Sequence, residues 1–400
     1  MSLRILFLTY DLPFPLNSGG KIRAYYFLKN LSRKHQLTLF SYYRDDEQKR
    51  HLPELEKYCK EIFLFKRGEV WTLKNIFKSL FSSLPFASTI YSVSQFEQSL
   101  KKELKTNNYD IVFFESYYPA LYLPLTKDLN FKTIMGNENI EYKVYERFIN
   151  QKPGFIKLLL SFEIAKMKQF EEKLWQTADL NLAVTKEDAE MIKKVTRRTP
   201  IIVPNGVDFS LYREVCPNLE SKNLVFIGNL KYQANADAVR YFLDKIYPTV
   251  KEQQIAKFIL VSLTRPKWLN AYLLDPNIEL IQDKTTPAVE FLRRGAVFVA
   301  PMRVGGGTNI KILEAMATGL PVVTTSIGNE GIAAIEGKEV LVADKPSDFS
   351  EKIVMLLKNT AISKKIGLSG KEFVGIKYDW SAICNILEKS CLNLANPKDD

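Results

Sequence analysis

The stretch VAPMRVGGGTNIKILEAMATGLPVV, which runs from Val299 to Val323, decides the fold of this chain. It predicts a strand, a glycine-rich loop, a helix over 310–318 and a second strand. Thr308 or Asn309 can cap the helix at its start, and Gly319 is placed for its C-terminal cap. Three glycines ahead of a helix let backbone N–H groups approach an anion, and the helix dipole favours a phosphate there.

Two charged residues lie in the first turns of the predicted helix, Lys311 and Glu314. Lys311 opposes the helix dipole unless a negative group lies nearby. Glu314 follows almost one turn later, and its carboxylate can accept hydrogen bonds from both hydroxyls of a ribose. A glycine-rich turn can also serve tight packing alone, so the glycine triplet by itself leaves both interpretations open.

Short apolar runs alternate with amphipathic helical stretches along all 400 residues. We expect strands at Arg4–Thr9, Leu37–Tyr43, Asp110–Phe114, Lys132–Met135, Leu180–Val184, Ile201–Val203, Leu224–Ile227, Phe258–Val261, Ile278–Ile281, Val297–Ala300 and Val322–Thr325. Solid apolar strands separated by helices predict parallel sheets that are covered on both faces. Two such series predict an α/β chain of two doubly wound, Rossmann-like domains, with ligands in an interdomain cleft beyond the carboxyl ends of the strands. The expected parts are an N-terminal domain over 1–208, a second domain over 209–378 and a final helix over 379–400.

The histidine and cysteine content limits the kinds of site that the chain can contain. Only two histidines are present, and the four cysteines (Cys59, Cys216, Cys384 and Cys391) have no paired spacing, so we expect neither a metal site nor a disulfide framework. No apolar run is long enough to span a bilayer, and the N-terminus does not resemble a signal peptide. These features predict a cytoplasmic protein.

Positive charge is concentrated in the first half of the chain. Residues 1–200 carry 32 Lys and Arg against 23 Asp and Glu, whereas residues 201–400 carry 24 against 22. The excess indicates an anionic partner such as a membrane surface, a phosphorylated substrate or nucleic acid, or else simply a lysine-rich surface. No nucleic-acid-binding module is recognisable, so we expect no nucleic-acid partner.

An amphipathic segment at 66–86 lies within this basic half. Lys66 and Arg67 precede a predicted helix whose apolar face combines Leu73, Ile76, Phe77, Leu80, Phe81 and Leu84. This composition is typical of a helix that lies on anionic lipid. A helix that packs into the core of its own domain has the same periodicity, and both interpretations stay open.

Five ordered motifs resemble those of one enzyme family. They are Pro13–Gly20, residues 178–188, Val203–Asp208 (VPNGVD), Leu224–Gly228 and Leu313–Val323 (LEAMATGLPVV). In these motifs the chain is similar to the family 4 (group 1) retaining glycosyltransferases of the GT-B fold. The similarity implies a metal-independent transferase of hexosyl type, with no cofactor, which uses a nucleotide diphosphate sugar bound mainly to the C-terminal domain.

The resemblance assigns roles to individual residues. Glu314 would hold the nucleotide ribose, and the remaining donor-binding residues would be Gly19, Gly20, Arg23, Asn205, Gly228, Asn229, Lys231, Gly305, Gly306, Gly307, Thr308, Asn309 and Lys311. Glu138 occupies the place of a histidine that the family often has after a strand, and we expect Glu138 and Asn139 to be catalytic. Asn139 follows it directly.

The chain also departs from the family pattern. Gly306 stands where the family often has Glu, Asn229 where it has Arg, and Asn235 where it has Lys. Arg23 and Lys311 are the cations that would compensate for these losses.

The expected function is sugar transfer to a glycan or lipid-linked acceptor in bacterial cell-envelope polysaccharide synthesis, peripheral at the inner face of the membrane if 66–86 binds lipid. A sugar-nucleotide epimerase on the same fold and an inactive, transferase-like scaffold are the alternatives.

Overall fold

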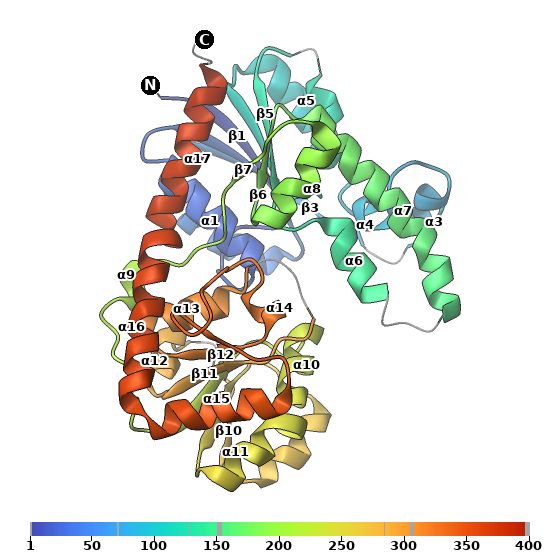
Figure 1. Cartoon of the computed structure of the whole chain (residues 1–400). Coiled ribbons are helices and arrows are strands. Elements are labelled where there is room, and N and C mark those ends of the chain that lie inside the picture. Colours follow the sequence, from blue (N-terminus) through green and yellow to red (C-terminus); the bar gives the residue numbers. More distant parts are fainter. Residues whose placement is uncertain are drawn as a thin grey trace. The chain divides into compact units, whose positions relative to one another are not determined.

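The computed structural model describes residues 2–69, 72–127, 129–149, 154–283, 285–304 and 308–396. It divides into two compact units, of which one contains Met1–Pro204 with Ile383–Asp400 and the other Asn205–Ala382 (Figure 1). The sequence placed these boundaries at 208 and 378. Each unit is built on one parallel sheet flanked by helices, so the predicted fold class, two doubly wound domains, is confirmed.

The sheet of the N-terminal unit has seven strands in the order β3-β2-β1-β4-β5-β6-β7, and every neighbouring pair is parallel. The strands are β1 Arg4–Thr9, β2 Gln36–Tyr43, β3 Glu61–Lys66, β4 Ile111–Glu115, β5 Lys132–Asn137, β6 Leu180–Ala183 and β7 Ile201–Ile202. Strand β3 was not predicted. Its side chains are mostly half-buried at the edge of the sheet, although residues 62–65 form a continuous apolar run (IFLF) as long as that of an inner strand such as β11 (Val297–Ala300).

The helices of this unit are α1 Gly19–Leu31, α2 Leu52–Leu55, α3 Leu73–Leu80, α4 Phe86–Thr89, α5 Ser94–Thr106, α6 Glu141–Ile149, α7 Gly154–Thr177 and α8 Lys186–Thr196, with 3-10 turns at Asp46–His51 and Pro119–Thr126. Helix α17, Trp380–Ala395, belongs to this unit from Ile383 onward. Gly19 and Gly20, two of the predicted donor-binding residues, are the first residues of α1.

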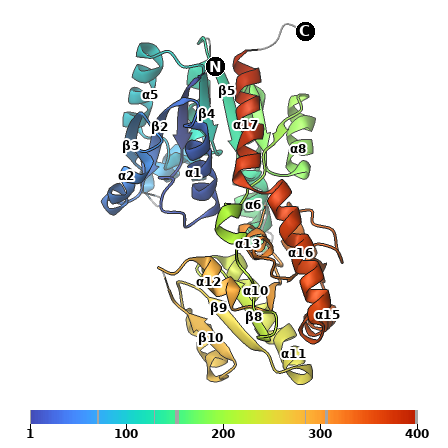
Figure 2. The same ribbon diagram turned by 90° about the vertical axis from the view of Figure 1, so that its left-hand side faces the viewer.

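The sheet of the C-terminal unit has six parallel strands in the order β10-β9-β8-β11-β12-β13. Figure 2 shows β10, β9 and β8 of this sheet. They are β8 Asn223–Ile227, β9 Lys257–Val261, β10 Ile278–Ile281, β11 Val297–Ala300, β12 Val322–Thr324 and β13 Leu341–Val342. Its helices are α9 Phe209–Tyr212, α10 Gln233–Tyr241, α11 Tyr247–Gln253, α12 Ala288–Arg293, α13 Ile310–Thr318, α14 Ser326–Asn329, α15 Pro346–Lys358 and α16 Thr360–Lys377, with a π-helical turn at Phe242–Ile246 and a 3-10 turn at Lys267–Leu274.

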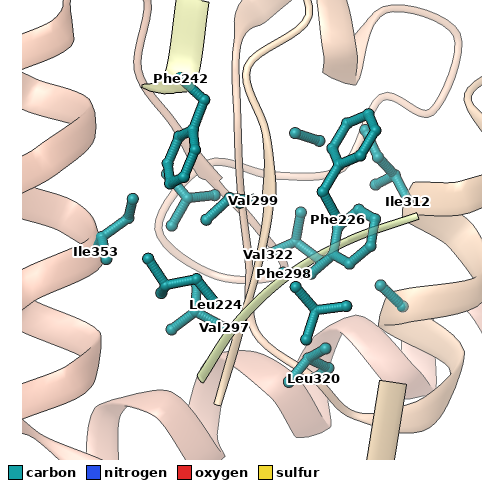
Figure 3. Close-up of a cluster of buried hydrophobic side chains, with 14 of the residues drawn as sticks. Leu224, Phe226, Phe242, Val297, Phe298, Val299, Ile312, Leu320, Val322 and Ile353 are labelled. Carbon is teal, nitrogen blue, oxygen red and sulfur yellow. The ribbon is translucent and has the colours of Figure 1, made fainter. Parts of the chain in front are cut away.

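Apolar side chains from both faces of this sheet form the core of the C-terminal unit (Figure 3). All four side chains of β11 are fully buried, and Phe298 stacks against Phe226 of β8 with ring centroids 6.5 Å apart. Ile312 of α13 packs against the same cluster. The core therefore fixes α13, with Lys311 and Glu314, relative to the ends of β8 and β11.

Candidate functional site

The loop between β11 and α13 begins the candidate donor site of the C-terminal unit. Gly305, Gly306 and Gly307 lie outside the described residues. Asn309 stands at the N-cap position of α13, but its side chain makes no capping hydrogen bond and instead donates to the carbonyl of Gly328 (3.1 Å). The predicted side-chain cap is therefore wrong.

The two ends of α13 are held in different ways. At its start, Thr308 Oγ1 donates to the carbonyl of Gly331 at 3.3 Å, so the helix is tied to the segment after β12. At its end, Gly319 caps the helix with φ of +85°, as predicted, because a residue without Cβ adopts this conformation at no steric cost.

Glu314 is held by a residue that the sequence did not single out. Oη of Tyr212, in α9, donates to Oε1 of Glu314 at 2.8 Å. Burial raises the pKa of Glu314, while the bond from Tyr212 and the charge of Lys311 oppose this rise. The carboxylate is thus oriented from one side. Tyr212 lies four residues beyond the VPNGVD motif, and its spacing gave no signal of this contact.

Lys311 is half-buried beside β8 and the start of α10. Its Nζ donates to Oδ1 of Asn235 at 2.6 Å and lies 5.6 Å from the ring centroid of Phe226. Burial lowers the pKa of Lys311 to about 8, and Glu314 opposes this effect. An ammonium group whose pKa is lowered by burial is a frequent feature of functional sites. An anionic ligand can take the place of the water that the ammonium group loses on burial.

The two asparagines that replace family cations belong to the same hydrogen-bonded chain. Asn235 Nδ2 donates to the carbonyl of Asn229 (3.0 Å), and Oδ1 of Asn229 accepts from the backbone N–H of Lys231 (3.0 Å). An added Cβ on Gly228 would lie 2.8 Å from Asn235 Nδ2, so this position has no room for a side chain. The side chain of Lys231 itself is exposed.

Arg303 is a second cation at this site, after Lys311, and it was not predicted from the sequence. It follows β11 closely, and its Nε donates to Oδ2 of Asp237 at 3.0 Å. Its guanidinium carbon lies 4.3 Å from the ring centroid of Tyr241. The carboxylate of Asp237 raises the pKa of Arg303, so this charge is permanent and already paired. Its position in the loop that starts at Pro301 was the available signal.

Arg23, one of the predicted donor-binding residues, lies in α1 of the N-terminal unit. It is fully buried, and its Nε donates to Oε1 of Glu115 at 2.7 Å. Its Nη1 donates to the carbonyl of Val203 at 2.8 Å and to that of Pro204 at 3.2 Å. These contacts join α1 to the end of β4 and to residues 203–204, so Arg23 has a structural role within its own unit.

Glu138 lies just beyond β5, close to the start of α1. Its Oε1 is enclosed and has no hydrogen-bond partner among the described residues. Burial raises the pKa of Glu138 to about 8, the charge of Glu115 adds to this rise, and Arg23 opposes it. A Cβ on Gly20 would lie 2.2 Å from Oη of Tyr10 and 2.5 Å from both carboxyl oxygens of Glu138. Gly20 therefore makes room for the pair, while Gly19 begins the helix.

Glu138 and Asn139 line a cavity of about 640 Å³ that lies wholly within the N-terminal unit. We call it the α6–α7 cavity, because helices α6 and α7 supply much of its wall. The sequence did not reveal it, since its lining comes from segments between Tyr10 and Met167 that are distant in the chain. Asn205, the remaining predicted donor residue, is buried at the start of the C-terminal unit.

Among the described residues, no group of three or more His, Cys, Asp or Glu could hold a metal ion. None of the described helices is both long and apolar enough to cross a membrane.

The chain has two Rossmann-like units, and a glycine-rich loop and a charged helix follow the fourth strand of the second unit. These features define the class of GT-B glycosyltransferases. The family models agree with this class: Glycosyltransferase Family 4 matches residues 17–211 and Glycosyl transferases group 1 matches residues 221–359. The chain belongs to these glycosyltransferases, with a family 4 domain followed by a group 1 domain.

Known proteins of similar length match this chain in sequence or in fold. An uncharacterized 44.6 kDa protein in the cps region of Klebsiella pneumoniae is 26% identical over 394 residues, which is 94% of this chain and 96% of that protein. The structure of a sucrose-phosphate synthase from Thermosynechococcus elongatus has a TM-score of 0.74 at 15% identity and covers 98% of this chain and 99% of its own. Anabaena HepE, in a complex with UDP-glucose, has a TM-score of 0.68 at 12% identity, with coverage of 98% and 100%.

Proposed function

We propose that this protein is a retaining, metal-independent hexosyltransferase. It moves a sugar from a nucleotide diphosphate donor to a glycan or lipid-linked acceptor in cell-envelope polysaccharide synthesis. The observation that carries the proposal is the pair of charges on α13: a carboxylate oriented by Tyr212 and an ammonium oriented by Asn235. The UDP-glucose bound to HepE supports the donor class, and the cps region of the Klebsiella relative supports the pathway.

The donor would lie on the C-terminal unit with its ribose on Glu314 and its diphosphate beside Lys311. The free oxygen of Glu314 can accept from a ribose hydroxyl, and Tyr212 fixes the carboxylate for this contact. As the bond between the sugar carbon and the diphosphate breaks, negative charge grows on the diphosphate. A half-buried ammonium stabilises that charge more strongly than an exposed one, because less water screens it.

The acceptor would bind the N-terminal unit near Glu138 and Asn139. In a retaining, front-face displacement the acceptor hydroxyl enters on the side from which the diphosphate leaves, and its proton passes to a phosphate oxygen of the leaving group. A pKa of about 8 keeps Glu138 mostly protonated at neutral pH, so it acts there as a hydrogen-bond donor to a sugar hydroxyl and not as a general base. Asn139 is the second polar group at this position.

The first test is a calorimetric titration of the full chain with UDP, GDP, ADP and dTDP sugars. We expect one nucleotide to bind, and Glu314→Ala to weaken it by about tenfold or more, because a charge-assisted hydrogen bond is lost. Tyr212→Phe is the matched control, since it removes only the hydroxyl that orients the carboxylate, and we expect a loss of about two- to fivefold. If none of these nucleotides binds at millimolar concentration, the transferase proposal fails and the scaffold alternative replaces it.

The structure also favours membrane binding by α3 over the alternative of a core-facing helix. Phe77 is 57% and Phe81 82% exposed, and their rings stack with centroids 6.1 Å apart, whereas the polar Asn75 and Ser79 are buried. The side chains of Leu73, Ile76 and Leu80, and residues 70–71, are outside what the structure describes. An apolar face that points outward beside lysines suits an anionic lipid surface. We therefore include peripheral attachment to the inner membrane face in the proposal.

A further inference from the structure

The α6–α7 cavity has two chemically distinct kinds of wall. Near Glu138, the wall consists of groups at the carboxyl ends of the strands, including Tyr10, Ser116 and Asn139. The other wall is apolar and comes from α6 and α7, chiefly Ile149, Leu160, Ile164 and Met167. Figure 1 shows these two helices together at one side of the N-terminal unit, reaching beyond its sheet.

A buried and a half-buried carboxylate brace the helical wall, so the cavity is not a gap between loosely packed helices. Glu171 of α7 is fully buried and accepts from the backbone N–H groups of Glu141 (2.9 Å) and Tyr142 (3.0 Å) at the start of α6. Glu163 accepts from the backbone N–H of Phe86, at the start of α4. These bonds fix α7 against both α6 and α4, because each satisfies backbone groups that helix starts leave unpaired.

The apolar wall does not suit a saccharide. Sugar hydroxyls placed against Ile164 and Met167 would lose their hydrogen bonds to water and gain none. A volume of about 640 Å³ lies in the range of pockets that enclose a drug-sized ligand, and such pockets are mostly apolar with a few placed polar groups. An apolar chain fits the helical wall, while the polar groups beside Glu138 suit the saccharide end.

Two arginines also line the cavity and suit a phosphate. Arg44 is exposed, and its Nε lies 3.1 Å from Oδ2 of Asp11. Arg67 is half-buried, with its guanidinium carbon 5.8 Å from the ring centroid of Tyr91. A guanidinium binds phosphate through paired N–H groups.

We propose that the α6–α7 cavity receives the apolar chain of an acceptor in which lipid and saccharide are joined through phosphate, with Arg44 and Arg67 on the phosphate. This inference rests on the proposed function, because it names the acceptor of that reaction. It concerns one unit alone and can be tested without the donor.

The test is calorimetry of the full chain with butyl, octyl and dodecyl phosphate, each below its micelle concentration, and with inorganic phosphate. We expect the affinity to rise about tenfold for every two methylenes buried, until the chain fills the cavity. Arg67→Met should weaken all alkyl phosphates by a similar factor of about five to ten, and octanol should not respond to this variant. An affinity that does not depend on chain length would overturn the proposal.

Two variants of α7 separate the cavity from the lipid surface. Leu160 lines the cavity and is 37% exposed, so Leu160→Asp is expected to fold and to weaken dodecyl phosphate by about tenfold or more. Phe162 is 75% exposed and does not line the cavity, so Phe162→Asp should leave dodecyl phosphate binding unchanged and reduce binding to anionic vesicles. The opposite pattern, with Phe162→Asp alone weakening dodecyl phosphate, would place the apolar chain outside the cavity.

The nucleotide titration keeps the two proposals distinguishable. Nucleotide binding without dependence on alkyl chain length leaves the transferase proposal intact and overturns the cavity assignment. Chain-length dependence without binding of any nucleotide sugar supports the cavity as a lipid phosphate site and overturns its role in sugar transfer.

Discussion

Replacing Lys311 by Met tests the candidate donor site most directly. Burial in the folded chain lowers the pKa of this lysine from 10.5 to about 8, so the C-terminal unit disfavours its charged form by about 3 kcal/mol. The bond from Nζ to Asn235, worth about 1 kcal/mol, is lost in the variant. We therefore expect Lys311→Met to raise the free energy of unfolding at neutral pH by about 2 kcal/mol.

The pH dependence of stability has a defined sign. Between about pH 8 and pH 10.5 the unfolded chain binds more protons at Lys311 than the folded chain, so the stability of the wild type rises with pH in this window. The destabilising effect of the charge is complete below about pH 8 and disappears above pH 10.5. The advantage of Lys311→Met should therefore shrink as the pH is raised through this window.

Donor affinity should change in the opposite direction. Losing an ammonium beside the diphosphate is expected to weaken the nucleotide sugar by about tenfold to a hundredfold. Wild-type affinity should fall as the pH rises above about 8, because the free protein loses the proton that the bound diphosphate needs, and Lys311→Met should lack this dependence. Lys231→Met is the matched control, since this exposed lysine is expected to contribute less than about threefold.

The assays are urea unfolding, followed by hydrogen exchange in peptides of β11 and α13, and calorimetric titration with the nucleotide sugar, both at about pH 7 and about pH 9.5. A variant that is less stable than the wild type and still binds the donor normally would show that Lys311 is a structural residue. A large loss on Lys231→Met instead would place the diphosphate beside the exposed loop after β8.

Three further predictions concern the N-terminal unit. Arg23→Met should lower the free energy of unfolding of this unit by about 3–5 kcal/mol, since Glu115 is left buried and unpaired. Adding Glu115→Gln should restore part of this loss. If urea unfolding shows that the two losses simply add, the buried pair is contradicted. Because burial raises the pKa of Glu138 to about 8, wild-type stability should fall as the pH rises from about 4.5 to about 8. Glu138→Gln should therefore be more stable than the wild type at about pH 9 and nearly equal to it at about pH 4. Melting temperatures of wild type and variant that change in parallel with pH would argue against this. Replacing Phe77 and Phe81 together by Ser should reduce sedimentation with anionic vesicles by about tenfold or more without changing nucleotide binding, and unchanged sedimentation would remove α3 from the membrane proposal.

The fold could be predicted because the inner strands carry their signal locally. Solid apolar runs such as Val297–Ala300 need a cover on both faces wherever they occur, which only a parallel sheet between helices provides. Strand β13 was missed because it has only two residues, Leu341 and Val342, and so contains no diagnostic run. Strand β3 was also missed, although residues 62–65 form a continuous apolar run that could have indicated it.

The candidate site was only partly predictable, because its contacts join residues that are distant in sequence. Lys311 and Glu314 stood out by their position on a helix after a glycine loop, but nothing local indicated Tyr212 as a partner. Arg23 looked like a cation available to phosphate, yet its partner Glu115 is 92 residues away, so its burial could not be seen from either segment. The α6–α7 cavity was invisible for the same reason.

The departures from the family pattern have a common physical explanation in the structure. A Lys at position 235 would place a second ammonium against Nζ of Lys311, at a distance where like charges repel strongly in a poorly hydrated site. The amide of Asn235 instead accepts from Lys311 through Oδ1 and donates to the carbonyl of Asn229 through Nδ2, so both its polar ends are satisfied. Losing the cations after β8 and holding one cation on α13 are therefore compatible parts of a single arrangement. In the proposed donor site, the charge beside the diphosphate would come from Lys311 of α13, and Asn235 of α10 orients it.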